Sequence, residues 1–118
     1  MLRASATTTE TDVDINGING NADAAAVGVE FGPELMQFAE AVATRDPDAL
    51  QDSRANLRAV AGTEVLVDAA GVAANFQRMV RIADSMGIPV DDTESELGKS
   101  VRAELNLARF ASAKNTFS

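Results

Sequence analysis

The chain has 118 residues, enough for one domain, and it contains no Cys and no His. Thiol catalysis, disulfides, thiolate or imidazole metal sites and the usual general base near neutral pH are therefore excluded. The formal net charge is -8, and residues 1–50 account for most of it, with nine acidic side chains against two basic ones. An acidic chain without a basic stripe argues against binding to nucleic acid or to an anionic membrane.

The core must be built without Trp or Tyr, because five Phe are the only aromatic residues. Ala, Val, Leu, Ile and Met suit closely packed helices better than a sheet, so we expect an all-α fold of about four helices. The start of the chain has no apolar signal-peptide region, and no apolar run approaches the ~20 residues that would span a membrane. We expect a cytoplasmic protein that uses no cofactor.

Residues 1–30 are rich in Thr, Asn, Gly and Asp and have few large apolar side chains. This composition predicts a flexible acidic tail, because little apolar burial would offset the entropy of ordering. The alternative is a calcium loop, since five residues fit the D-x-[DN]-x-[DN]-G spacing with an acid at the twelfth position. They are Asp12, Asp14, Asn16, Gly17 and Asp23. Against this alternative, no amphipathic helix enters the loop, so the flexible tail is the preferred interpretation.

Residues 31–116 have the start and stop signals of a helical domain. Pro33 fits the first turn of one helix, and Asp46 before Pro47 can cap the next. Gly62 ends this second helix.

A third helix is expected over about 63–86, ending before Gly87, and a capping box of Thr93 and Glu96 introduces the last helix. The first half of the third helix, "VLVDAAGVAANF", is apolar nearly all round and should be buried on most sides. Gly71 in its interior costs about 1 kcal/mol relative to Ala, which suggests that a neighbouring backbone packs close to it.

Polar side chains follow one stripe of the third helix at spacings of three to four residues, and others lie near its end. The candidates are Asp68, Asn75, Arg78, Arg81 and Asp84. One interpretation is a buried site for an anionic or carbonyl group, with the guanidinium of Arg78 as the binding fork. The preferred interpretation is structural, because buried charges in small helical proteins usually occur as pairs with neighbouring helices or a second subunit.

The succession of elements in residues 31–116 resembles the C-terminal half of the carboxymuconolactone decarboxylase and alkylhydroperoxidase-D-like superfamily, in particular its peroxidase-related branch. The resemblance lies in a helix ending "TRDP", a short helix, an apolar helix closing in "RIADSMGIP", and the ending "LNLARFASAKNT". It implies a small helical bundle that completes its core by assembling into dimers, trimers or hexamers. Redox members carry a Cys-x-x-Cys pair and a His, which this chain lacks, so a thiol peroxidase is excluded.

Three functions follow from these observations. The preferred one is a non-redox homo-oligomeric or accessory module, with the third helix at the subunit contact and a Cys-containing relative as a further candidate partner. The alternatives are a thiol-independent decarboxylase or lactone-type enzyme that uses carboxylates and Arg78 or Arg81, and a calcium-regulated binder. The sequence names no catalytic residue, substrate or oligomer number.

Overall fold

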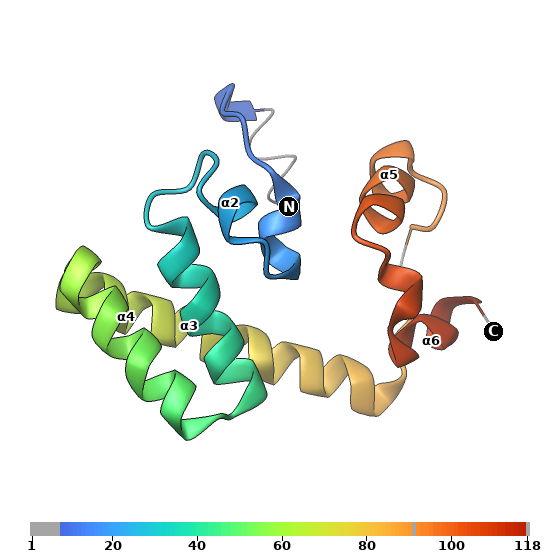
Figure 1. Ribbon diagram of the computed structural model, residues 1–118. Coiled ribbons are helices and arrows are strands. Elements are labelled where there is room, and N and C mark those ends of the chain that lie inside the picture. Colours follow the sequence, from blue (N-terminus) through green and yellow to red (C-terminus); the bar gives the residue numbers. More distant parts are fainter. Residues whose placement is uncertain (1–7, 91, 118) are drawn as a thin grey trace. The chain divides into compact units, whose positions relative to one another are not determined.

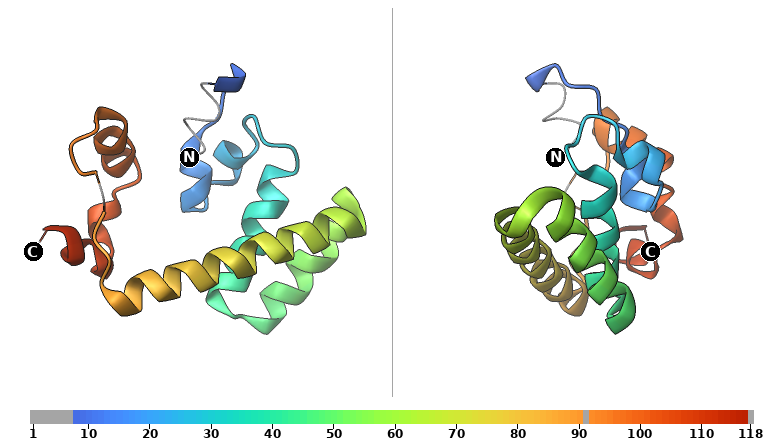
Figure 2. Two further views of the ribbon diagram at one scale, coloured as in Figure 1. Left: turned by 180° about the vertical axis from the view of Figure 1, so that it is seen from behind. Right: turned by 60° about the vertical axis from the view of Figure 1, so that its left-hand side comes forward.

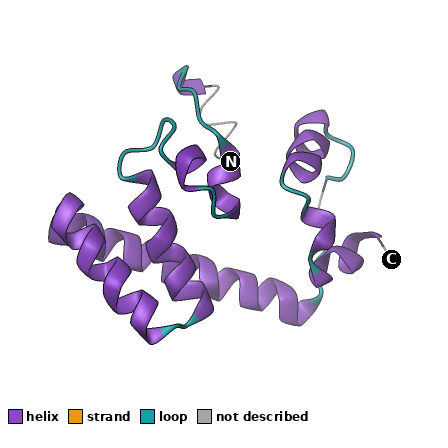
Figure 3. Ribbon diagram, in the orientation of Figure 1, coloured by secondary structure: helices purple, strands orange, loops and turns teal. Residues whose placement is uncertain are grey.

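The computed structural model describes residues 8–90 and 92–117, and every regular element in these ranges is helical (Figures 1 and 3). The predicted all-α fold is therefore confirmed. Over the same ranges, no helix is both long enough and apolar enough to pass through a membrane. The elements are η1 (Ile15–Asn19), α2 (Ala22–Ala25), α3 (Gly32–Thr44), α4 (Pro47–Met86), α5 (Glu96–Glu104), η2 (Leu107–Arg109), η3 (Ala111–Ala113) and α6 (Lys114–Phe117).

The chain forms two compact units, one reaching to Asn75 and the other starting at Phe76, so the predicted domain of residues 31–116 extends over both. In the first unit, α4 begins at Pro47 as predicted. The Asp46 carboxylate caps it by accepting hydrogen bonds from the backbone amides of Asp48 and Ala49, at 3.0 and 3.1 Å.

Helix α4 is broken at Gly62, where the sequence predicts the boundary between two helices. The backbone there has φ 90° and ψ 173°, a conformation that is essentially restricted to glycine. Figure 2 shows the chain turning back at the end of the green segment, so that the following residues run beside residues 47–61. The predicted break is confirmed, and the label α4 covers the two helical segments on either side of Gly62.

The segment expected to be a flexible acidic tail contains two short helices, η1 and α2, in its described part. Helices η1 and α2 pack against each other and against α3, and Ile15 is only 2% exposed. A Cβ added at Gly32 would overlap the carbonyl oxygen of Ala25, so glycine is what permits α3 to begin this close to α2. Small side chains thus give this segment a packed interface that its low hydrophobicity does not reveal. Residues 1–7 of the predicted tail lie outside the described residues.

The core of the first unit is small. Among the described residues it consists of Ile15, Ala24, Ala25, Phe38, Ala41 and Leu57. None of these lies after Gly62, in the stretch of α4 that the sequence predicts to be buried on most sides. That prediction is wrong for the single chain, because the first unit supplies too few elements to surround this part of α4.

The second unit has little buried apolar surface, and Leu105 is its buried apolar residue among those described. Helix α5 begins at Glu96 and is capped by Ser95, whose hydroxyl accepts a hydrogen bond from the Gly98 amide at 3.3 Å. The predicted capping box of Thr93 and Glu96 is therefore wrong. Thr93 lies too far upstream to cap, and its carbonyl instead accepts a hydrogen bond from the guanidinium of Arg102.

Candidate functional site

The candidate polar residues of α4 are all exposed, whereas the sequence predicts a buried set. Asp68 and Asn75 lie in the first unit, and Arg78, Arg81 and Asp84 lie in the second. These five residues thus do not form one enclosed binding site within α4.

The part of α4 that belongs to the second unit carries exposed apolar side chains. We call this surface the α4 apolar face; its residues are Phe76, Met79, Val80, Ile82 and Met86. Their exposure ranges from 49% for Ile82 to 73% for Met86. A cluster of exposed large apolar side chains on one helical segment is typical of an interaction surface rather than of ordinary solvent-facing helix.

Gly71 lies earlier in α4, in the first unit. A Cβ added there would have no neighbouring atom within 4 Å, so packing inside the chain does not require a glycine. Its φ is that of an ordinary helical residue, so the backbone does not require one either. The cost of about 1 kcal/mol relative to Ala is therefore not offset by any contact of the single chain.

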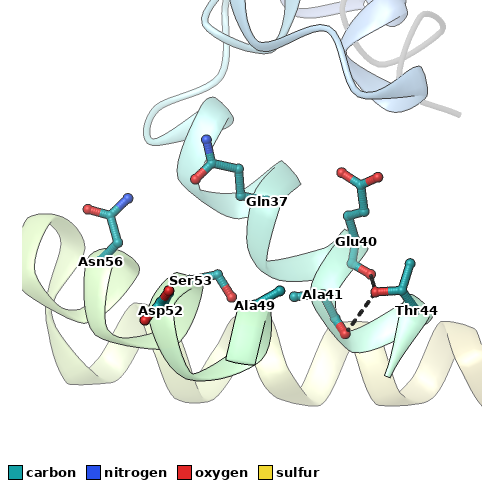
Figure 4. A pocket seen from close by; sticks show the side chains of 8 residues that line it. All are labelled: Gln37, Glu40, Ala41, Thr44, Ala49, Asp52, Ser53 and Asn56. Atoms are coloured by element: carbon teal, nitrogen blue, oxygen red, sulfur yellow. Dashed lines mark hydrogen bonds between the residues drawn. The ribbon is translucent and has the colours of Figure 1, made fainter. Parts of the chain in front are cut away.

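A separate open hollow of about 530 Å³ lies where α3 faces the first segment of α4 (Figure 4). It is lined by Gln37, Glu40, Ala41, Thr44, Ala49, Asp52, Ser53 and Asn56. The Thr44 hydroxyl donates to the Glu40 carbonyl at 2.9 Å, and the Ser53 hydroxyl donates to the Leu50 carbonyl at 3.3 Å. Both hydroxyls are thus used within their own helices, and the Glu40 and Asp52 carboxylates are exposed.

Sequence reasoning missed this hollow. The available signal is the spacing of four residues between Glu40 and Thr44 and between Asp52 and Asn56, which places a polar pair on one side of each helix. The spacing does not reveal that the two polar sides face each other, because that depends on how α3 packs on α4.

The residues of the calcium loop, the less favoured alternative from the sequence, have other roles in the structure. The Asp14 carboxylate caps η1, accepting hydrogen bonds from the backbone amide and the side-chain amide of Asn16, both at 2.9 Å. Asn16 belongs to η1, and Asp23 lies in the first turn of α2, where it complements the helix dipole. In residues 8–90 and 92–117, no group of three acidic side chains is placed to hold a metal ion.

Two surfaces of the described chain can therefore contact another molecule, the α4 apolar face and the open hollow. The first is made of apolar side chains, and the second is lined mainly by polar residues. Of these two surfaces, only the α4 apolar face leaves large apolar side chains in water. Burying such side chains contributes more favourable free energy to binding than covering exposed polar groups does. No protein-family model, no curated protein and no solved structure gives a significant match to the chain.

Proposed function

We propose that this chain is a cytoplasmic, non-redox helical protein that acts as a homo-oligomeric or accessory module, related to the alkylhydroperoxidase-D-like and carboxymuconolactone decarboxylase-like proteins. The α4 apolar face is the observation that carries the proposal. A second copy would cover side chains such as Phe76 and Met86, which are 52% and 73% exposed in the single chain. The complete lack of Cys restricts the module to roles without thiol chemistry.

The energetics favour assembly. Complete burial of a Val, Ile or Met side chain contributes roughly 1.5–3 kcal/mol, so a partner that covers even part of the α4 apolar face supplies several kcal/mol. The core within the first unit is made largely of Ala, with Phe38 and Leu57 as its largest members. Small domains with so little internal burial commonly gain the missing stability by oligomerising.

In the accessory form of the proposal, the same face binds a Cys-containing relative instead of a second copy.

The alternative function is a thiol-independent decarboxylase or lactone-type enzyme that uses carboxylate and Arg side chains. Catalytic carboxyl groups of this kind are usually set in water-excluded pockets. Glu40 and Asp52 line the open hollow but are exposed, and we therefore favour assembly over catalysis.

Native mass spectrometry of the full chain at micromolar concentration tests the proposal. We expect a mass that is a multiple of the single-chain mass, and a strictly monomeric mass would overturn the homo-oligomer. Ile82→Asp places a charge in the α4 apolar face and is expected to shift the protein toward monomer. Ala59→Asp is the matched control, because it adds the same charge at an exposed position of α4 before Gly62.

A further inference from the structure

We infer that Asn19 is a site of spontaneous deamidation, which converts its side-chain amide to a carboxylate, and that the fold protects the nearby Asn16 from the same reaction. The two residues belong to a tandem repeat, "INGING", in which each Asn lies between an Ile and a Gly. Because their immediate neighbours are identical, the two sites have the same local chemistry. A difference in their reactivity therefore comes from the structure.

Deamidation of this kind is fastest where glycine follows the asparagine. The backbone nitrogen of Gly20 attacks the side-chain carbonyl carbon of Asn19, a nitrogen–carbon bond forms, and the side-chain nitrogen leaves as ammonia with the proton of the backbone amide. Water then opens the resulting five-membered succinimide ring at either carbonyl, which gives aspartate or isoaspartate. Glycine favours ring closure because it has no Cβ to crowd the attacking nitrogen and because its backbone rotates freely.

The structure leaves room for this reaction at Asn19. Both Asn19 and Gly20 are exposed, and Gly20 is the C-cap of η1, with φ 90° and ψ 12°. A Cβ built at Gly20 would have no neighbouring atom within 4 Å. The Gly20 amide donates to the Gly17 carbonyl at 3.2 Å, and this bond has to open before the nitrogen can attack. A backbone hydrogen bond at the exposed end of a short helix opens at a low cost in free energy.

The same tripeptide is held in place at Asn16. Its side-chain amide donates to the Asp14 carboxylate at 2.9 Å, which ties the side chain to the residue that caps η1. Gly17 is buried, and a Cβ built on it would lie 2.7 Å from the Cα of Ala25, so the backbone of α2 packs directly against this glycine. Ring closure at Asn16 therefore requires η1 to separate from α2, whereas ring closure at Asn19 does not.

The isoleucines that precede the two asparagines differ in the same way. Ile15 is 2% exposed, and Ile18 is 62% exposed. The first copy of the repeat is thus packed into the first unit and the second copy lies in solvent, although the two copies have the same residues.

Deamidation at Asn19 changes both the charge and the backbone. Either product adds a negative charge to the first 50 residues, which are already acidic. Isoaspartate also carries the main chain through its side-chain carbon, which inserts a methylene group before Gly20 and alters the C-cap of η1. The isoaspartate form therefore loses the hydrogen bond between Gly20 and Gly17, while the aspartate form keeps a normal backbone.

Peptide mapping by mass spectrometry tests the inference, after the full chain has been incubated at mildly alkaline pH. Fragmentation of the peptide assigns the reaction to Asn16 or Asn19. We expect Asn16 to react at least about tenfold more slowly than Asn19 in the native protein, because it reacts only after local opening of a packed segment. In denaturant, the two sites should react at rates within about threefold of each other, because the packing is lost.

The native protein and the denatured protein together decide the outcome. Equal rates at the two sites in the native protein would overturn the inference, and so would faster reaction at Asn16. A native Asn19 that does not react, while both sites react in denaturant, would also overturn it. Asn19→Gln is the control for the assignment, because it keeps an amide but closes a ring far more slowly, and native protein with this change should show no fast deamidation in the repeat.

Asn19→Asp separates the effect of the charge from that of the backbone. This variant carries the added carboxylate on a normal main chain, so the Gly20 amide should keep its protection from hydrogen exchange. The same amide should lose its protection in the isoaspartate fraction of the incubated protein. Equal protection in the two samples would overturn the predicted change at the C-cap.

Discussion

The backbone amide of Val90 donates a hydrogen bond to the side-chain hydroxyl of Thr116 at 2.9 Å, although 26 residues separate them in sequence. This bond joins the segment that follows α4 to the last helix, α6. Leu105 is the buried apolar residue among those described in the second unit. A hydrogen bond between residues far apart in sequence therefore contributes a larger part of the stabilising contacts in this unit than it would in a well-packed domain.

Thr116→Val should remove this hydrogen bond while keeping the shape of the side chain. Because the net contribution of such a bond is about 1 kcal/mol, hydrogen exchange at the Val90 amide should become roughly fivefold faster. Thr116→Ser keeps the hydroxyl and serves as the control. Unchanged exchange in both variants would show that the bond does not protect this amide.

Leu57→Ala should destabilise the first unit strongly. Leu57 has no exposed surface, and truncating a buried leucine usually costs 2–5 kcal/mol, so we expect a loss of about that size in the free energy of unfolding. Val60→Ala, one turn later on α4 at a side chain that is 47% exposed, should cost less than about 1 kcal/mol. Chemical denaturation of both variants measures the difference, and equal losses would contradict the assigned core.

Ser95→Ala should remove the N-terminal cap of α5, whereas Thr93→Ala should leave the cap intact. Loss of a serine cap costs about 1 kcal/mol of helix stability, so the Gly98 amide should exchange faster in the first variant only. The Thr93 hydroxyl instead donates to the carboxylate of Glu94. If Thr93→Ala accelerated exchange at the Gly98 amide more than Ser95→Ala did, the capping box that the sequence predicts would be correct after all.

Gly62→Ala should cost more than Gly20→Ala, although both glycines have φ 90° and open space for a Cβ. Gly20 has ψ 12°, near the left-handed helical region that other residues can enter at a cost of about 1 kcal/mol. Gly62 has ψ 173°, in a region of backbone conformation that residues other than glycine almost never adopt. We therefore expect Gly62→Ala to lower the free energy of unfolding by an amount toward the upper end of about 1–3 kcal/mol. Thermal unfolding of the two variants compares them directly.

The sequence predicts those features of the fold that depend on local backbone chemistry. Asp46 before Pro47, Gly62 and Gly87 mark helix boundaries because capping geometry, fixed φ angles and positive φ angles are properties of a few neighbouring residues. The α5 cap shows the limit of this reasoning. Thr93 and Ser95 are both good capping residues, and tertiary contacts such as the one between Arg102 and the Thr93 carbonyl decide between them.

Burial is the property that the sequence predicts least well here. The packing of Ile15 against small residues of α2 and α3 depends on which surfaces meet, and a Thr- and Asn-rich segment gives no periodic signal for it. The reverse error occurs in α4, where the apolar residues around Gly71 suggest a buried helix. An apolar pattern shows that a surface should be covered, but it does not show whether the same chain covers it.

The proposed pairing through the α4 apolar face would link the stability of the protein to its abundance. If part of the stabilising burial comes from a second copy, the free energy of unfolding contains a mass-action contribution, and the melting temperature rises with protein concentration. The folded population would then fall steeply at low expression, where unpaired chains are open to proteolysis. A cell could thus set the working level of this protein through the exposed residues of a single helix.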